Sequence, residues 1–350
     1  MSDQKYEKYW EITLAYTDIF GEGFNTSLRI IIDFIDERLG TPYSKEKYEE
    51  LQNRLQKNLP KSLPSIRKSI NQFVKLGFVR PGLAAYHPAA KIFLKETDAE
   101  KKRAIFSRIV YAYSSFDSSV KDISDKKEIN FLIKTLQAVG RLERADVLAL
   151  MTVDVSQVPQ GYLDAEGLSR QRQHAQAIGF GERKYNQLSH FWSVLGNLDG
   201  IVVRDGSVLE KTVMVADEPA SRAITKRDSY LQLLYKIELQ EESSRHFGTI
   251  ACMVEKLPYP SLIASHIKPY RECNIEIEAF DGDNGLLLSP NLDSLFDKGY
   301  ISFASDGSIL LSNNLQEKLK AALKHLSLDR KFLTEGRLVY LEHHRTKVFV

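Results

Sequence analysis

Residues 261–299 read SLIASHIKPYRECNIEIEAFDGDNGLLLSPNLDSLFDKG, and they decide the fold of the C-terminal part of the chain. A short apolar run ends near His266 and is stopped by a proline, which indicates a β-strand. After a polar loop, a second short strand begins behind Asn284. Pro290 then stands at the start of a predicted helix that ends at Gly299. The expected order is strand, strand and helix, with a polar side chain on each element.

The polar side chains of this unit suit metal-assisted phosphodiester hydrolysis. His266 can take a proton from water near pH 7, because a free imidazole has a pKa of about 6.5. Asp293 and Asp297 project from one helix face, and their oxygens can hold a hard divalent cation that stabilises charge on a phosphate. The amide of Asn284 can hold the histidine in place.

These motifs resemble the HNH endonuclease family, in particular its restriction-enzyme branch with Ser-His-Ile-Lys-Pro, Asn-Gly-Leu-Leu-Leu-Ser-Pro and Leu-Phe-Asp-Lys-Gly signatures. The resemblance implies a C-terminal ββα-metal nuclease domain. It implies that His266 is the general base, that Asn284 is the family's central asparagine, and that Asp293 is a metal ligand where the family usually has its second histidine. Asp297 falls where some members carry another histidine.

The likeness continues through residues 300–303 and 306–312 and resumes at 340–349. Arg345 in this last stretch can contact phosphate, as can Lys268 behind the catalytic motif. We expect a C-terminal strand near His343 and His344. For these two histidines, a structural role is as consistent with the sequence as a functional one.

Two departures from the family affect the expected metal. Ser265 stands where the wider family often has an acidic or histidine ligand, so the first ligand is left open, with Asp281 or Asp283 as substitutes. The zinc-binding cysteine pairs of other members are absent, since the chain has only Cys252 and Cys273. We therefore expect Mg²⁺, with Mn²⁺ as an alternative, and no structural zinc.

Charge is concentrated in the N-terminal part of the chain. Residues 41–91 contain ten Lys and Arg against three Glu, a local balance of +7, although the whole chain of 350 residues has a net charge of only +2. Apolar periodicity predicts helices at 27–39, 44–57 and 65–75, followed by a small hairpin at 78–86. This is the order of a winged helix, in which the third helix lies in the DNA major groove.

The third helix offers side chains that can contact phosphates or base edges. They are Arg67, Lys68, Asn71, Gln72 and Lys75. The alternative is an ordinary solvated helical face.

A similar order recurs further along the chain. Helices are predicted at 165–178 and 182–195, and a hairpin at 201–209 turns at Asp205-Gly206. A linker is expected at 213–226, followed by a helix from residue 228.

The expected fold is multi-domain and mainly α with α+β parts. A winged-helix-like DNA-binding domain at 1–97 precedes a helical region with a second winged-helix-like unit at 98–225 and the HNH nuclease domain at 226–350.

Composition limits the class of protein. Hydrophobic residues make up 43% of the chain and charged residues 27%, which excludes disorder, and there is no long apolar run for a membrane span or signal peptide. We expect a cytoplasmic protein without a membrane partner.

The functional prediction is a site-specific type II restriction enzyme that acts in phage defence. It cuts double-stranded DNA to 5′-phosphate and 3′-hydroxyl ends as a homodimer on a palindromic site. A cognate DNA methyltransferase would be encoded nearby. The alternatives are a nuclease or nickase that recognises modified bases or has no specific site, and a DNA-binding regulator with an inactive HNH unit.

Overall fold

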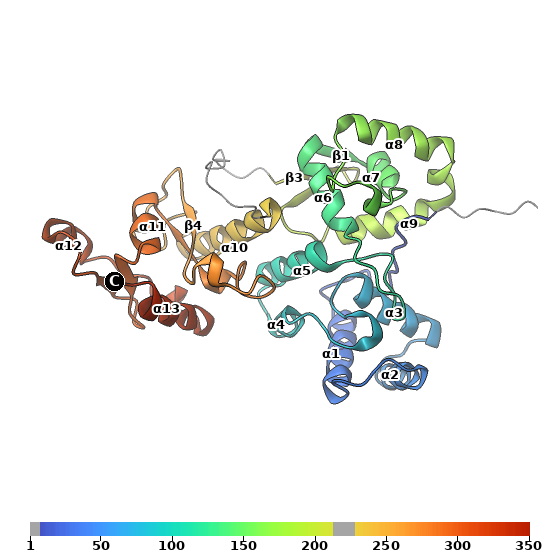
Figure 1. Ribbon diagram of the computed structural model, residues 1–350, viewed down its shortest axis with the longest axis horizontal. Helices are drawn as coiled ribbons and strands as arrows, with labels where there is room; N and C mark the ends of the chain where they lie inside the picture. The colour runs from blue at the N-terminus through green and yellow to red at the C-terminus, as the bar shows by residue number, and fades with distance from the viewer. Residues whose placement is uncertain (1–7, 213–227) are drawn as a thin grey trace, which may run out of the picture. The chain divides into compact units, whose positions relative to one another are not determined.

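The computed structural model describes residues 8–212 and 228–350 (Figure 1). The chain divides into two compact units, Met1–Thr212 (unit 1) and Val213–Val350 (unit 2). The predicted linker and the domain boundary placed near residue 225 lie outside the described residues. Unit 1 spans both of the predicted N-terminal domains up to Thr212. Within the described ranges, no helix is long and apolar enough to cross a membrane.

The first half of unit 1 is helical. It contains α1 (Glu22–Glu37), α2 (Lys45–Asn58), α3 (Leu63–Lys75), the 3₁₀ turn η1 (Pro81–Leu83), α4 (Ala89–Lys95) and α5 (Ala99–Tyr113). The helices α1 to α3 confirm the three predicted helices. Ser44 caps α2, because its hydroxyl accepts a hydrogen bond from the backbone N–H of Lys47.

The predicted hairpin after α3 is reduced to a single bridge between Val79 and Tyr86. The turn η1 occupies the space between them. Pro81 has no N–H to give to a strand, and Gly82 takes a φ of 74°, which ends the extended backbone. The winged-helix assignment for this half of unit 1 stays a prediction.

The second half of unit 1 combines helices with a small antiparallel sheet. It contains α6 (Glu128–Val139), β1 (Arg141–Glu143), α7 (Arg144–Leu150), η2 (Val155–Gln157), α8 (Ala165–Ala177), α9 (Phe180–Leu195), β2 (Ile201–Arg204) and β3 (Val208–Lys211). The helices α8 and α9 and the hairpin β2–β3 confirm the predicted elements. Asp205 and Gly206 have φ of 49° and 64° at the hairpin turn. The strand β1 pairs with β3, giving the order β1-β3-β2.

Unit 2 is built around two small hairpins with helices packed against them. It contains α10 (Ser229–Phe247), β4 (Ile263–His266), η3 (Tyr270–Glu272), η4 (Gly282–Asn284), β5 (Gly285–Leu288), α11 (Pro290–Asp297), β6 (Ile301–Phe303), β7 (Ile309–Leu311), α12 (Glu317–Leu323), η5 (Arg330–Phe332) and α13 (Glu335–Lys347). The predicted order of strand, strand and helix is confirmed by β4, β5 and α11. The strands β4 and β5 are antiparallel, with Ser265 opposite Leu286 and His266 opposite Gly285.

The expected C-terminal strand is wrong, because His343 and His344 lie on the helix α13. Thr334 caps this helix by accepting a hydrogen bond from the backbone N–H of Arg337. The buried residues of α13 are Arg337, Leu341 and His344, which recur at helical spacing. Only one of the three is apolar, so a hydrophobic pattern does not reveal the helix.

His344 is a structural residue that fixes α13 to α11. Its Nε2 donates to the Phe296 carbonyl at 3.0 Å, its Nδ1 accepts from the Ser302 hydroxyl at 3.0 Å, and its ring stacks on the Phe296 ring at 3.9 Å. Burial lowers the pKa of His344 to about 4, so that the ring is neutral at pH 7.

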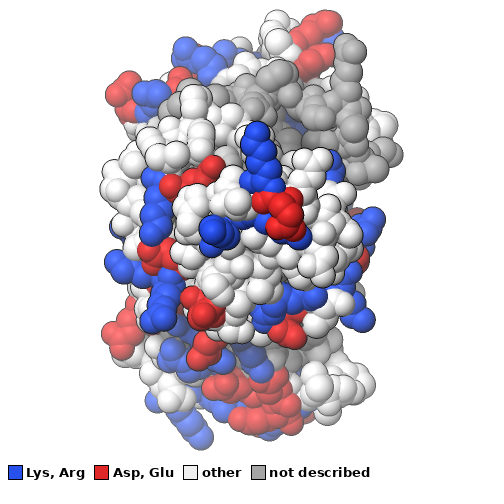
Figure 2. All heavy atoms as spheres, turned by 90° about the vertical axis from the view of Figure 1, so that its left-hand side faces the viewer, with Lys and Arg blue, Asp and Glu red and all other residues white. Residues whose placement is uncertain are grey.

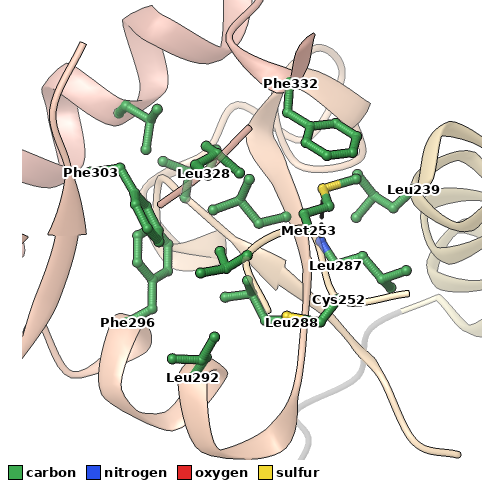
Figure 3. Packing of buried hydrophobic residues seen from close by; sticks show 14 of the residues in the cluster. Leu239, Cys252, Met253, Leu287, Leu288, Leu292, Phe296, Phe303, Leu328 and Phe332 are labelled. Atoms are coloured by element: carbon green, nitrogen blue, oxygen red, sulfur yellow. Dashed lines mark hydrogen bonds between the residues drawn. The ribbon is translucent and has the colours of Figure 1, made fainter. Parts of the chain in front are cut away.

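The strand β5 runs through the core of unit 2, as Figure 3 shows. Leu286, Leu287 and Leu288 are each fully buried, which explains the continuous apolar run in place of an alternating pattern. In Figure 3, Leu287 points toward Leu239, a residue of α10, and Leu288 points toward Leu292, a residue of α11. Each buried leucine contributes about 1.5–3 kcal/mol relative to exposure. This core holds β4 and α11 in fixed positions beside β5.

Candidate active site

Unit 2 contains a cavity of about 580 Å³ at the end of β4. Its walls come from β4, the loop that follows it, α11 and the C-terminal end of α13. Three of the predicted site residues line it together, namely His266, Asp293 and Asp297. Ser265 lines the same cavity. The structure therefore brings the predicted base and both predicted metal ligands to one opening.

His266 is held by a hydrogen bond and two aromatic contacts. Its Nε2 lies 2.8 Å from the carbonyl oxygen of Ala279. Because a carbonyl oxygen only accepts, Nε2 carries the proton in this contact, and Nδ1 carries the lone pair of the neutral ring. Tyr235 stacks on the imidazole at 4.6 Å, and the Tyr270 ring meets it edge-on at 5.6 Å. The imidazole is thus oriented as a proton acceptor.

Asn284 is fully buried and holds the long loop between β4 and β5 in shape. Its Oδ1 accepts from the backbone N–H of Lys268 at 2.7 Å, and its Nδ2 donates to the carbonyl of Glu278 at 3.0 Å. Glu278 directly precedes Ala279, whose carbonyl binds His266. Asn284 therefore acts on His266 indirectly, by fixing the peptide that orients its ring. This is a positioning role.

Asp293 and Asp297 are close enough to influence each other's charge. Desolvation raises the pKa of the Asp293 carboxyl above its usual range, and the negative charge of Asp297 adds to this effect. The neighbouring Ser265 side chain acts in the opposite direction. The hydroxyl of Ser265 is buried next to this carboxyl. The result is a pair of carboxylates, half-buried at Asp293 and exposed at Asp297, beside the Ser265 hydroxyl.

These oxygen atoms fit a hard divalent cation that keeps several of its waters. Within the described part of the chain, no group of three or more His, Cys, Asp or Glu side chains is placed to hold a metal ion. Mg²⁺ is typically bound through one or two carboxylates together with water and substrate phosphate, and this requirement is met by Asp293 and Asp297.

The two aspartates considered as substitutes for the first ligand lie elsewhere. Asp281 accepts a hydrogen bond from the Tyr340 hydroxyl at 3.0 Å, and Asp283 accepts one from the Thr334 hydroxyl at 2.9 Å. Neither aspartate lines the cavity. Their contacts join the loop before β5 to α13 and its cap, which is a structural arrangement.

The predicted DNA-contacting residues of α3 face two directions. Arg67 and Lys68 are exposed. Gln72 and Lys75 are buried, at 1% and 8% exposure. Gln72 bonds to the backbone N–H and carbonyl of Tyr16, and the Lys75 ammonium donates to a backbone carbonyl at 2.7 Å. These two side chains secure the N-terminal segment and are not on the surface of α3.

The other three predicted DNA contacts also have partners within the protein. Asn71 accepts from the backbone N–H of Val120 at 3.2 Å. Lys268 pairs with Glu278 at 2.6 Å. Arg345 donates to the carbonyl of Phe303 at 2.8 Å and pairs with the neighbouring Glu342. Their roles toward DNA stay predictions.

Several residues at the cavity are not found by the sequence reasoning. Arg271, Lys298 and Lys347 line it and add positive charge near the carboxylates. Lys298 directly follows Asp297 in the Leu-Phe-Asp-Lys-Gly motif, so its place at the cavity could be predicted from the sequence. The place of Lys347 could not, because it reaches the cavity from the end of α13, far along the chain.

A comparison with protein families gives one match, to a family described as HNH endonuclease, over residues 252–304. No match was found among curated proteins. The matched range contains β4, β5 and α11, and with them His266, Asn284, Asp293 and Asp297. The match supports the resemblance to the HNH family and, with it, a nuclease domain in unit 2.

Proposed function

We propose that this protein is a divalent-metal-dependent endonuclease that hydrolyses phosphodiester bonds in double-stranded DNA, with unit 2 as its nuclease domain. The observation that carries the proposal is the orientation of His266. Its Nε2–H donates to the Ala279 carbonyl, which leaves Nδ1 as the proton acceptor, and the same cavity holds two carboxylates. A base beside paired carboxylates can activate water and hold a cation that stabilises charge on a phosphodiester.

In the proposed reaction, His266 removes a proton from water through Nδ1. The resulting hydroxide attacks the phosphorus in line and the bond to the 3′ oxygen breaks. The leaving oxygen takes a proton from solvent water, and His266 returns its proton to solvent, so that the products carry 5′-phosphate and 3′-hydroxyl ends. Asn284 keeps the loop that orients the base, because it bonds the Glu278 carbonyl beside Ala279. The fixed ring needs no rearrangement at the moment of proton transfer.

Asp293 and Asp297 would hold Mg²⁺ or Mn²⁺ at this site. When bound, such an ion stabilises the negative charge that develops on the phosphate and on the leaving oxygen. Arg271, Lys298 and Lys347 line the same cavity and offer contacts for the DNA backbone on either side of the scissile phosphate. Their charge offsets that of the carboxylates, so that an anionic substrate can enter.

We propose further that unit 1 binds the DNA. Figure 2 faces the side of the molecule that carries α11, α12 and α13 of unit 2 (Figure 1), and there Lys and Arg side chains are interspersed with Asp and Glu. The proposal for unit 1 rests instead on two particular cations. Arg67 and Lys68 on α3 are exposed. The helices before the hairpin β2–β3 follow the order that predicts a winged helix. A site-specific restriction enzyme, dimeric and paired with a methyltransferase, is the most specific form of this proposal.

The direct test is incubation of the full-length protein with unmethylated phage DNA and Mg²⁺, followed by electrophoresis. Discrete fragments support a site-specific enzyme, and a smear supports a nuclease without a specific site. Intact DNA under both Mg²⁺ and Mn²⁺ would contradict the proposal and favour a DNA-binding regulator.

The substitution His266→Ala should abolish cleavage while DNA binding, measured by gel shift, stays within about twofold of the unmodified protein. Removing the general base alone typically costs about 10²–10⁴-fold in rate. His325→Ala is the matched control, since His325 is an exposed histidine of the same unit. Cleavage that survives His266→Ala would show that another group is the base.

A further inference from the structure

We propose that Tyr235, on α10 and outside the matched residues 252–304, is a positioning residue that fixes the plane of the His266 imidazole. This inference rests on the proposed role of His266 as general base. It assigns a part of the site to a helix that neither the motif nor the family match contains.

Tyr235 contacts His266 with its ring face. The two ring centroids are 4.6 Å apart, and the ring planes differ by only 22°, which is a stacked arrangement. Tyr235 is fully buried, so its ring has no freedom to move away from the imidazole. An offset or stacked aromatic pair of this kind is worth about 0.5–1.5 kcal/mol beyond the area that it buries.

The Tyr235 hydroxyl anchors the same ring to both strands of the hairpin. It lies within hydrogen-bond distance of two backbone carbonyls, 3.2 Å from that of Ser265 and 3.0 Å from that of Asn284. Ser265 precedes His266 on β4, and Asn284 precedes Gly285, the residue opposite His266 on β5. The hydroxyl has one proton, which these two carbonyls share, so the Tyr235 ring is held next to His266 on β4 and next to Gly285 on β5.

Gly285 supplies independent evidence for this close approach. A Cβ atom at this position would overlap the Tyr235 hydroxyl oxygen and would lie 2.7 Å from Cδ1 of Leu239, a separation that real Cβ atoms essentially never show. The φ of Gly285 is −135°, an extended conformation that any residue adopts. The glycine after Asn284 is thus required by the approach of α10, and not by the backbone conformation.

The hydrogen bond and the stack constrain the imidazole in complementary ways. The bond from Nε2 to the Ala279 carbonyl fixes one end of the ring but allows rotation about the direction of that bond. Contact with the face of Tyr235 removes this rotation, and the Tyr270 ring, which lines the cavity at 82° to the imidazole, limits movement on that side. Together they give Nδ1 one direction. A displacement of about 1 Å of a catalytic group can cost about 10²-fold in rate.

The first experiment examines the stack without assaying cleavage. The full-length protein is labelled with [¹³C,¹⁵N]-histidine, and the His266 signals among the eight histidines are assigned from the His266→Ala variant. The Tyr235 ring should shift the imidazole ring protons upfield through its ring current. Tyr235→Phe should keep this shift, and Tyr235→Met should lose it. Unshifted imidazole protons in the unmodified protein would overturn the proposal.

The second experiment separates positioning from binding, by nicking of supercoiled plasmid DNA with Mg²⁺. Tyr235→Met should lower kcat about 10- to 100-fold with KM within about twofold, because only the base is displaced. Tyr235→Phe should restore most of kcat. Phe332→Met is the control, since Phe332 is an equally buried aromatic residue of the same core that contacts Phe247 and His246.

The outcomes distinguish the two proposals. An unchanged kcat in folded Tyr235→Met protein would overturn the positioning role while leaving the nuclease proposal intact. Equal losses in Tyr235→Phe and Tyr235→Met would assign the effect to the hydroxyl and overturn the role of the stack. If Tyr235→Met does not fold, the ring-current shift in the unmodified protein and the kcat of Tyr235→Phe still decide the question. Cleavage that survives His266→Ala overturns the role of His266 as base, and with it this inference, whatever the ring-current result. Intact DNA under both Mg²⁺ and Mn²⁺ overturns the proposed function.

Discussion

Arg337 is the largest fully buried side chain in the described part of the protein, and its replacement by methionine should destabilise unit 2 strongly. The guanidinium forms five hydrogen bonds, which account for all of its N–H groups. Two go to the Glu242 carboxylate, at 3.0 and 2.7 Å. The others go to the carbonyls of Gly282, Gly285 and Phe332. Arg337 thereby joins α10, the start of β5 and α13.

The expected loss follows from these contacts. Removal of Arg337 leaves the carboxylate of Glu242, which is 12% exposed, without a cation. Breaking one partner of a buried ion pair costs about 3–5 kcal/mol. Three buried carbonyls also lose a donor, at about 1 kcal/mol each, and the methionine side chain recovers part of this by packing. We expect a net loss of about 4–6 kcal/mol, or a fall in Tm of roughly 10–20 °C for a unit of this size.

The loss in free energy of unfolding and in Tm can be measured by thermal and urea unfolding of the full-length protein, monitored by circular dichroism and by fluorescence. Replacing both partners, Glu242→Leu with Arg337→Met, should recover at least about 2 kcal/mol, because no buried charge is then left unpaired. Lys320→Met is the control, since Lys320 pairs with Glu317, which is 88% exposed, and should cost less than about 1 kcal/mol. A Tm for Arg337→Met within about 3 °C of the unmodified protein would refute the reasoning, as would a double variant no more stable than the single one.

Two further predictions concern the cavity and the DNA. Asp293→Asn should increase the free energy of unfolding of the metal-free protein at pH 7 by less than about 1 kcal/mol, because desolvation and the charge of Asp297 raise the pKa of Asp293. This gain should shrink as the pH falls through the pKa of Asp293 in the folded protein, because the carboxyl then becomes neutral. The variant should also lose any rise in Tm that Mn²⁺ gives the unmodified protein. An unchanged rise in Tm would contradict the assignment of Asp293 as a metal ligand. Charge reversal at Arg67 and Lys68 should weaken duplex binding. The slope of the logarithm of the binding constant against the logarithm of salt concentration should become shallower by about one unit per lost phosphate contact. Charge reversal at the exposed Lys121 is the control and should change neither quantity. Unchanged binding across the salt titration would exclude this part of α3 from the DNA contacts.

The core of the site could be predicted because its residues are close together in the sequence. The strands β4 and β5 and the helix α11 lie within 263–297, and local apolar patterns with a proline at the helix start indicate all three. His266, Asp293 and Asp297 then meet because a hairpin followed by a helix returns to the same end of the strand. Short-range geometry is sufficient for this part of the molecule.

Charge counts could not show which side of α3 faces water. Gln72 and Lys75 look like DNA contacts by residue type, yet both are buried. The side-chain amide of Gln72 forms hydrogen bonds with the backbone N–H and carbonyl of Tyr16, as a neighbouring strand would. It thereby satisfies backbone groups of an N-terminal segment that has no regular secondary structure. Such a segment has no periodicity of its own, and its contacts with α3 therefore leave no sign in the local pattern.

The buried polar residues of unit 2 escaped prediction for a related reason. The inner face of α13 carries Arg337 and His344, which a hydrophobic pattern assigns to the surface, and the helix was expected as a strand. Each of these residues is buried only because its hydrogen bonds are satisfied by distant elements, such as Glu242 on α10 and Ser302 on β6. The pairing of residues so far apart in the chain cannot be deduced from either segment alone.

The residues that line the site lie mostly in one short stretch of the sequence, whereas residues that keep their side chains and backbone in place come from distant helices. The matched range 252–304 contains the proposed base, the central asparagine and the two carboxylates. The imidazole is stacked on Tyr235 from α10, and the carbonyls on either side of Asn284 are bound by Arg337 from α13. A segment with the same motif but without these two helices would keep every proposed catalytic group and lose the contacts that orient them. We expect activity to depend on α10 and α13 as well as on the motif, because a misaligned base contributes less to the rate.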